Sequence, residues 1–246
     1  FRIEDHIDRL FNSLQYLRID PVMTKQGYVD ASIEVLEANL PLLEVDEDYW
    51  VGQRISRGVD GPDVDTSAEG GPTIVIECAP LPLKERASLY RDGIEMIIPS
   101  VRRVPPESLS PRVKTHNYLN LIMGDLEVRS RNPKAWAILM DMNGNLCEGI
   151  GSNVFTVKNG VVYTPNSQYV LGGISRETVF DLGKKIDIPV VEKDIDLYDA
   201  VTADEVFLTS TSLCVCPVTN VNGSPIGDGV VTGPITKAIT DAYIDL

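Results

Sequence analysis

The chain opens with apolar residues at helical spacing. They recur every three or four positions at Ile3, Ile7, Leu10, Phe11, Leu14 and Leu17. This pattern predicts an amphipathic helix over residues 3–17. A second amphipathic helix is expected over about 30–40, ending before a proline. Strand-like runs follow at 48–59 and 73–79, separated by a loop over 61–72 that is rich in Gly, Pro, Asp and Ser.

The second half of the chain mixes strand and helix patterns. Strands are expected at 93–104, 135–140, 153–157, 161–164, 205–209 and 215–218. Helices are expected at 115–129, at 175–185 and from Gly233-Pro234 onward. In the 115–129 helix the predicted core face comprises Leu119, Ile122 and Leu126. The dipeptides Asn143-Gly144 and Asn159-Gly160 indicate hairpin turns.

The elements divide into two groups around a polar stretch at 83–93, which is predicted to be a linker. We therefore expect a smaller N-terminal α/β domain over 1–88 and a larger C-terminal domain over 89–246. Strands and helices alternate without a strict βαβ repeat, which favours an α+β fold over a doubly wound sheet. The sequence begins at Phe1 without a methionine, so its N-terminal part is expected to be incomplete.

Composition narrows the class of protein. The 246 residues include 36 acidic and 22 basic side chains, a formal charge of −14, and no run that would supply a basic face for nucleic acid. No window predicts a membrane span or a signal peptide. The four cysteines are too sparse for a disulfide framework, and Cys214 and Cys216 are expected as small buried thiols on one strand face. With only two histidines, no metal site is predicted. The sparse cysteines favour a reducing, cytoplasmic location.

Two segments could bind an anion. Gly172-Gly173 leads directly into the 175–185 helix, with Ser175 as the expected N-cap, and the free N–H groups of a first helical turn suit a phosphate. An ordinary capped helix would look the same. The hydroxyl cluster from Thr209 to Ser212 follows a strand, where such side chains line sites or satisfy a turn.

Two further residues could carry chemistry. Lys114 lies between a proline-interrupted strand and an apolar helix, close in sequence to Arg112. Lysine becomes a nucleophile when its ammonium is desolvated or placed near other cations, although most lysines are solvated surface charges. A catalytic Lys114 is therefore expected to be buried. Glu148 stands next to a glycine between two strand segments, where it could be a turn residue or point into a cleft.

Taken together, the motifs resemble the class IV, or fold-type IV, pyridoxal phosphate (PLP) aminotransferases. This family contains branched-chain, D-amino acid and (R)-amine transaminases and aminodeoxychorismate lyase. The matching segments, in chain order, are His6-Ile7-Asp8-Arg9, Asn117-Tyr118 after Lys114, Glu148 to Asn153, Leu171 to Arg176, and Thr211. The resemblance covers essentially the whole chain, but the family's first strands, which precede the His-x-x-Arg helix, are missing.

The resemblance implies a two-domain fold-type IV enzyme with PLP as its cofactor. Lys114 would carry the cofactor as a Schiff base and Glu148 would pair with its pyridine nitrogen. The resemblance also implies that the phosphate is bound by Arg9, Ile174, Ser175 and Thr211. Tyr118 would bind the phenolic oxygen and Leu171 would pack on the ring. Asn153 is a further implied cofactor contact.

The substrate is less strongly indicated. On the strand near residue 50, alternation places Arg54 on one face with Trp50, and Arg54 and Ser212 are the expected substrate contacts. The preferred hypothesis is a branched-chain-like α-amino acid donor and a 2-oxo acid acceptor, bound by a homodimer. The stretch Val101 to Pro106 is instead similar to (R)-amine transaminases. D-amino acid transamination, a lyase, and a non-enzymatic interaction domain are further alternatives.

Overall fold

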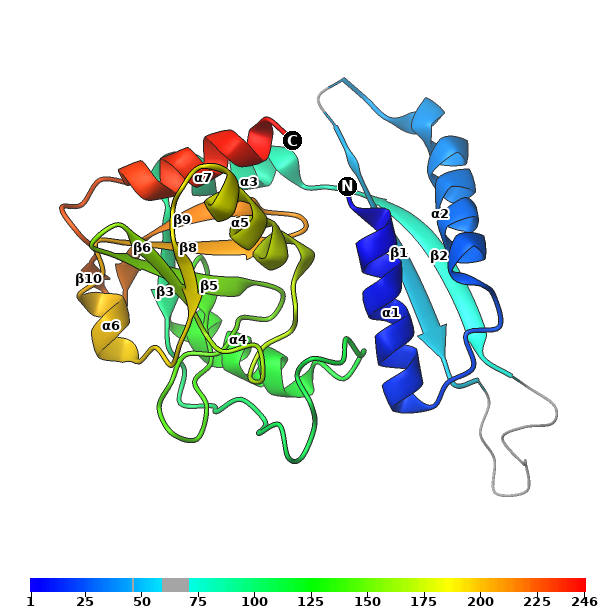
Figure 1. Cartoon of the computed structure of the whole chain (residues 1–246), viewed down its shortest axis with the longest axis horizontal. Coiled ribbons are helices and arrows are strands. Elements are labelled where there is room, and N and C mark those ends of the chain that lie inside the picture. The colour runs from blue at the N-terminus through cyan, green and yellow to red at the C-terminus, as the bar shows by residue number, and fades with distance from the viewer. Residues whose placement is uncertain (46, 59–70) are drawn as a thin grey trace. The chain divides into compact units, whose positions relative to one another are not determined.

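The computed structural model describes residues 1–45, 47–58 and 71–246. It divides into two compact units, Phe1–Glu85 and Arg86–Leu246 (Figure 1). The predicted boundary at 88/89 falls inside a helix, and the assignment of two domains at that boundary stays a prediction. None of the helices within the described ranges has the length and apolarity needed to cross a bilayer.

The smaller unit packs two helices on one face of a two-stranded ribbon. Its elements are α1 (Ile3–Leu17), α2 (Lys25–Asn39), the 3-10 turn η1 (Leu40–Leu42), β1 (Tyr49–Ser56) and β2 (Thr73–Pro80). The strands pair antiparallel, and Ile55 is buried with Ile7, Leu14 and Tyr28. The predicted helices and strands are confirmed, with α2 starting earlier because Thr24 accepts the N–H of Gly27. Residues 61–70 of the predicted loop lie outside the described residues.

The larger unit is built on an eight-stranded mixed sheet. Its strands are β3 (Ile94–Ile97), β4 (Trp136–Ala137), β5 (Asn153–Lys158), β6 (Val161–Thr164), β7 (Val190–Glu192), β8 (Glu205–Ser210), β9 (Cys214–Val221) and β10 (Ser224–Pro225). The order is β4-β3-β9-β8-β5-β6-β7, with β10 paired to β9. β5, β6, β8 and β9 pair antiparallel, while β3 runs parallel to both β4 and β9. The α+β prediction is therefore confirmed.

Helices cover this sheet. They are α3 (Leu83–Asp92), α4 (Leu119–Arg131), α5 (Ile174–Lys185), α6 (Leu197–Val201) and α7 (Pro234–Ile244). Phe155 and Phe207 stack at 4.8 Å between ring centroids and pack with Val179 of α5 and Ile239 of α7. Helices α5 and α7 lie next to each other on this side of the sheet (Figure 1). The alternate strand positions, such as Val154 and Leu208, pack against α6 on the other face. This period of two fixes which strand residues can reach a site.

Residues 83–92 of the predicted linker form helix α3, and the division between the two units, after Glu85, falls within this helix. Its apolar contact is Leu89, which packs against the sheet core, and the helix ends where Gly93 adopts a φ of 76°. The polar composition reflects a helix that is exposed over most of its surface. The strand expected at 93–104 is also shorter, since β3 stops at Ile97 before Pro99, which has no N–H for a ladder.

The predicted core face of α4 is wrong. Leu119, Ile122 and Leu126 are 66%, 39% and 56% exposed, whereas Leu121 and Val128 are buried. The helix begins at Leu119 and turns its Leu121 side toward residues 135–139. Similarly, Cys216 is buried as expected, but Cys214 is exposed at a φ of 53° where β9 begins.

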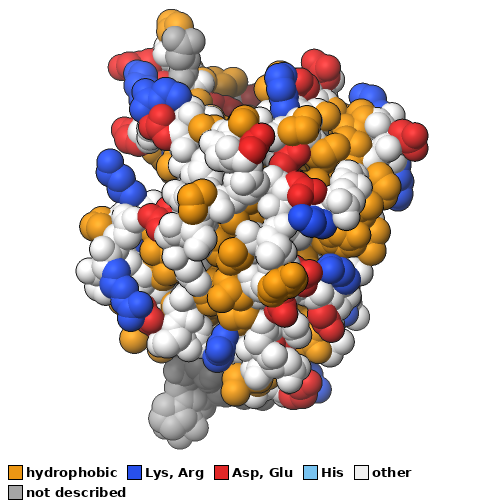
Figure 2. Space-filling model, turned by 90° about the vertical axis from the view of Figure 1, so that its left-hand side faces the viewer, with side chains coloured by type: hydrophobic (Ala, Val, Ile, Leu, Met, Phe, Trp, Pro, Cys, Tyr) orange, Lys and Arg blue, Asp and Glu red, His pale blue; other side chains and the backbone are white. Residues whose placement is uncertain are grey.

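Side chains of both signs are distributed over the surface. On the face drawn in Figure 2, basic side chains are interspersed with acidic and apolar ones. Most ion pairs of the described residues, such as Lys237 with Asp241 at 2.6 Å, join exposed groups. Such pairs contribute little to stability. The buried pairs described below are therefore the ones that need a structural explanation.

Two leucines of α4 test the orientation of this helix. Leu121→Ala should lower the free energy of unfolding by about 2–3 kcal/mol, because it removes a buried side chain. Leu126→Ala should change it by less than about 0.5 kcal/mol, since its side chain is exposed. Urea unfolding of the two variants measures the difference, and equal losses would contradict the described orientation.

Candidate active site

Glu148 is positioned by a tight reversal of the chain. Gly144 has a φ of 91°, and the N–H of Asp141 donates to the carbonyl of Asn145 at 2.8 Å. The predicted turn at Asn143-Gly144 is thereby confirmed. Beyond it, the N–H of Leu139 donates to the carbonyl of Glu148 at 3.1 Å. The pairing of these two segments places the Glu148 side chain inside the unit, 5% exposed.

Both carboxylate oxygens of Glu148 have partners. Oε1 accepts from Nη2 of Arg103 at 3.0 Å and from its Nε at 3.2 Å, and Oε2 accepts the N–H of Leu171 at 2.9 Å. Burial raises the pKa of Glu148, and the charges of Arg103 and Lys114 and the Leu171 N–H oppose this rise. The turn-residue alternative for Glu148 is therefore wrong, since its charge is buried and bound.

Arg103 was missed by the sequence reasoning as a site residue. Its backbone N–H donates to the carbonyl of Met140 at 2.8 Å, so it lies beside the segment that also pairs with Glu148. Asn120 of α4 fixes the neighbouring backbone, because its Oδ1 accepts the N–H of Val104 and its Nδ2 donates to the carbonyl of Arg102. The available signal was the Arg102-Arg103 pair, but nothing in the sequence indicates which arginine turns inward.

Lys114 contacts another predicted site residue. Its Nζ lies 3.1 Å from the hydroxyl of Tyr118, which immediately precedes α4. The charge of Lys114 also acts on the Glu148 carboxyl, so the two groups share one region of the larger unit. The expected desolvation of Lys114 is not observed, because its side chain is exposed on the turn-rich segment that precedes α4.

The segment from Leu171 to Arg176 connects Glu148 to α5. The carbonyl of Leu171 accepts from Nδ2 of Asn153 at 3.1 Å, and its N–H binds Glu148. A Cβ at Gly173 would collide with Oδ1 of Asn153, which explains the glycine there. Helix α5 begins at Ile174, and no side chain caps it. Its first N–H groups therefore have no acceptor within the helix.

The expected N-cap role of Ser175 is wrong. The capping position belongs to Gly173, and Ser175 lies one residue inside the helix. Its buried hydroxyl contacts the hydroxyl of Tyr243 on α7 at 3.1 Å. The side chain therefore joins α5 to α7, and only the backbone N–H of Ser175 is left for the predicted anion contact.

Arg176 anchors the same turn. It is 1% exposed, and its Nη2 donates to Glu192 at 2.7 Å and to the carbonyl of Pro165 at 3.0 Å. Burial would raise the pKa of Glu192, but the Arg176 guanidinium and the N–H of Ser167 outweigh it and lower that pKa. The buried ion pair ties the start of α5 to β7 and to the end of β6.

The hydroxyl cluster is divided by the end of β8. Thr209 is fully buried opposite Asn153, and its Oγ1 has no partner among the described residues. Thr211 is exposed and Ser212 is partly buried in the turn between β8 and β9. Loops at a strand end can carry binding groups on a rigid sheet, so this turn is well placed for the predicted contacts.

These residues fit a phosphate-bearing cofactor. A Cβ at Gly151 or Gly172 would meet no atom of the described residues, so open space adjoins the Glu148 and Leu171 segments. The uncapped first turn of α5 can bind a phosphate, and the ionised Glu148 can bind a protonated ring nitrogen. Lysine, the nucleophile that the cofactor requires, is present at Lys114 within the electrostatic reach of Glu148.

Two predicted residues belong to the smaller unit. On α1, Nη2 of Arg9 lies 3.3 Å from Nδ1 of His6. Arg54 on β1 forms an ion pair with Glu77 of β2 at 2.5 Å, on the ribbon face opposite Ile55. Their predicted contacts with phosphate and substrate stay predictions.

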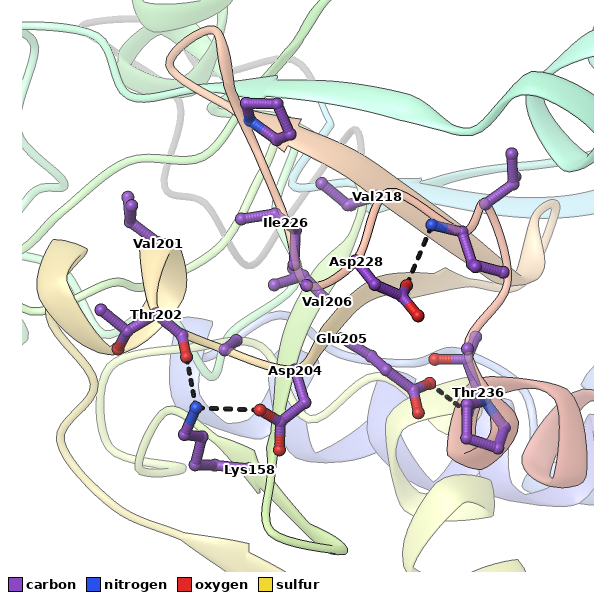
Figure 3. A pocket seen from close by; sticks show the side chains of 17 residues that line it. Lys158, Val201, Thr202, Asp204, Glu205, Val206, Val218, Ile226, Asp228 and Thr236 are labelled. Carbon is purple, nitrogen blue, oxygen red and sulfur yellow. Dashed lines mark hydrogen bonds and ion pairs between the residues drawn. The ribbon is translucent and has the colours of Figure 1, made fainter.

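A large cavity of the larger unit is not the candidate site. It measures about 630 Å³ and is lined by β8, β9 and the start of α7 (Figure 3). Lys158 is bound to Asp204 at 2.8 Å, and the Glu205 carboxylate accepts the N–H groups of Ile235 and Thr236 at 2.9 and 2.7 Å. None of the predicted site residues lines this cavity. Glu205 caps α7, which is a structural role.

The chain is similar to known proteins of the family that its motifs resemble. The family model described as amino-transferase class IV matches residues 1–221. A putative branched-chain-amino-acid aminotransferase of Methanocaldococcus jannaschii is 37% identical over 247 residues, covering 100% of this chain and 82% of that protein.

Solved structures agree with this match. The branched-chain amino acid aminotransferase of Escherichia coli has a TM-score of 0.89 at 29% identity and aligns with 100% of this chain and 79% of its own. The branched-chain amino acid aminotransferase of Thermobaculum terrenum, in its PLP form, has a TM-score of 0.86 at 28% identity, covering 100% of this chain and 78% of that one.

The capping role of Glu205 can be tested by stability. Glu205→Ala should lower the free energy of unfolding by about 2–4 kcal/mol, because two N–H groups at the start of α7 lose a charged acceptor. Asp228→Ala, an exposed carboxylate on the same cavity, should cost less than about 1 kcal/mol. Thermal and urea unfolding give both values, and an equal cost would rule out a special role for Glu205.

Proposed function

Because the chain belongs to the class IV amino-transferase family, we propose that it is a PLP-dependent aminotransferase. It moves an amino group between a branched-chain-like α-amino acid and a 2-oxo acid. The single observation that supports this most directly is the buried Glu148 carboxylate, bound by Arg103 and the Leu171 N–H and within the electrostatic reach of Lys114.

Lys114 and Glu148 divide the chemistry between them. When bound, PLP supplies an electron-withdrawing ring that stabilises negative charge at the substrate α-carbon. Lys114 would hold the cofactor covalently and, once released, its amine would take the proton from the substrate α-carbon and deliver it to cofactor carbon C4′. Glu148 holds a proton on the ring nitrogen, for which it must be ionised. The Tyr118 hydroxyl, 3.1 Å from Nζ, orients the lysine and would bind the cofactor's phenolic oxygen.

The phosphate is assigned to backbone and basic groups. The N–H groups of Ile174 and Ser175 at the start of α5 would bind it through the positive end of the helix, together with Thr211. The phosphate contact of Arg9, in the smaller unit, is proposed from the family resemblance alone. Asn153 and Leu171 act beside the ring. The Asn153 amide bond to the Leu171 carbonyl supports this role, because it fixes the loop that also binds Glu148.

The substrate assignment rests on relatives and on one arginine. The Methanocaldococcus jannaschii and Escherichia coli proteins carry branched-chain names, which favours that class over (R)-amine, D-amino acid or lyase chemistry. Arg54 and Ser212 are the proposed contacts for the substrate carboxylate, since a guanidinium suits a carboxylate. A homodimer in the cytoplasm is the proposed state of the enzyme.

A panel of amino donors tests this function. With 2-oxoglutarate or pyruvate as acceptor, L-leucine and L-valine should be converted at least about tenfold more efficiently than D-alanine or (R)-1-phenylethylamine, because the proposed pocket selects an L-α-carboxylate and an apolar side chain. Product formation is followed by chromatography. Lys114→Ala is the control and should be inactive with every donor. Activity with the aromatic amine alone would overturn the substrate class.

Arg103 should control the pH dependence of this activity. Burial raises the pKa of Glu148 and Arg103 lowers it, so Arg103→Met should raise it further. Because the ionised form is required, the acidic limb of the kcat profile should move to higher pH, and kcat at neutral pH should fall by at least about tenfold. Arg102→Met is the matched control, since Arg102 is exposed. Unchanged profiles in both variants would contradict the role given to Glu148.

A further inference from the structure

Helix α3 holds the turn between β8 and β9 through two side chains. Arg86 donates from Nη1 to the carbonyl of Ser212 at 2.6 Å, and the Tyr90 hydroxyl donates to the carbonyl of Leu213 at 2.7 Å. The two residues are four apart and therefore lie on one face of the helix. Leu89 packs the helix against the sheet core, so the two donors come from an anchored element.

The turn is constrained on one side and open on the other. The Leu213 side chain is fully buried, and its N–H donates to the carbonyl and hydroxyl of Ser210. With two successive carbonyls bound by α3, the peptide planes around Ser212 and Leu213 are fixed. In the described parts of the chain, the N–H groups of Thr211 and Ser212 have no acceptor. These two donors and the adjacent hydroxyls are available to a ligand.

We infer that Arg86 and Tyr90 are positioning residues, which hold the β8–β9 turn so that Thr211 and Ser212 present their donors to an anionic group of the substrate or cofactor. This inference rests on the proposed function, which assigns phosphate and carboxylate contacts to this turn. Arg86 adds a permanent positive charge at the turn, through its bond to the Ser212 carbonyl. A carboxylate or a phosphate is therefore the chemical class that the turn accepts.

The state of Tyr90 suits a permanent donor. Partial burial, and after it the neighbouring Cys216 and Cys214, raise the pKa of Tyr90 to about 12, against the lowering effect of the Arg86 charge. The hydroxyl therefore keeps its proton at any pH at which the enzyme would be assayed. Arg86 and Tyr90 are remote in sequence from every motif that carries the family resemblance.

Three variants of α3, assayed in the PLP-loaded enzyme, test the inference. Arg86→Met should raise KM for L-leucine by about tenfold while kcat changes by less than about twofold, because the turn loses a charged bond that orders its donors. Arg86→Lys should restore KM to within about threefold of the parent enzyme. Tyr90→Phe, which removes one hydroxyl, should raise KM by about threefold. The PLP dissociation constant, measured separately by fluorescence, reports the phosphate contact.

Arg91→Met is the matched control, since Arg91 lies on the same helix and pairs with the exposed Asp92 at 2.6 Å. It should leave KM, kcat and the PLP dissociation constant unchanged. The inference is overturned if Arg86→Met and Tyr90→Phe both behave like Arg91→Met, or if their losses are in kcat alone. An inactive parent enzyme that takes up no PLP would instead refute the proposed function.

Discussion

The structure of the candidate site depends on one buried carboxyl group, that of Glu148, and on the partners bound to both of its oxygens. An ionised carboxylate without partners is too costly to bury, so Glu148 can occupy its position only with the Arg103 guanidinium and the Leu171 N–H bound to it. Each partner fixes a different part of the chain. Arg103 lies on the strand-like segment after β3, and Leu171 lies on the loop before α5. The carboxyl group that the proposed mechanism uses is therefore also the point at which three segments meet.

Local signals predicted much of this framework. Asn143-Gly144 and Asn159-Gly160 each specify a reversal, because the glycine φ angles of 91° and 77° are unfavourable for other residues. The period of 3.6 in α1 and the glycines ahead of α5 likewise act within a few residues. The order of the motifs then predicted the class IV family, and the family model confirms it. These features depend on neighbours in the sequence, which is why reading the sequence was enough.

Features set by distant contacts were not predictable. The polar segment 83–92 has weak helical periodicity, and its structure depends on Leu89 and on the turn at Ser212, more than 120 residues away. The buried side of α4 is set by its packing on residues 135–139, which buries Leu121 and leaves Leu119 exposed. Ser175 has a side chain suited to an N-cap, but the capping position is Gly173, where any side chain would collide with Asn153. In each case a tertiary contact overrode a local preference.

Three arginines give the site its shape in a chain with 36 acidic and 22 basic residues. Arg103 binds Glu148, Arg176 binds Glu192 and the Pro165 carbonyl, and Arg86 binds the Ser212 carbonyl. Each one fixes a segment that the proposed mechanism uses. These segments are the one that carries Glu148, the first turn of α5, and the β8–β9 turn. Arginine suits this task because its charge is permanent and its donors reach several acceptors at once. A lysine would supply the same charge without fixing direction, so the arrangement of the anion-binding backbone groups follows from where these guanidinium groups lie.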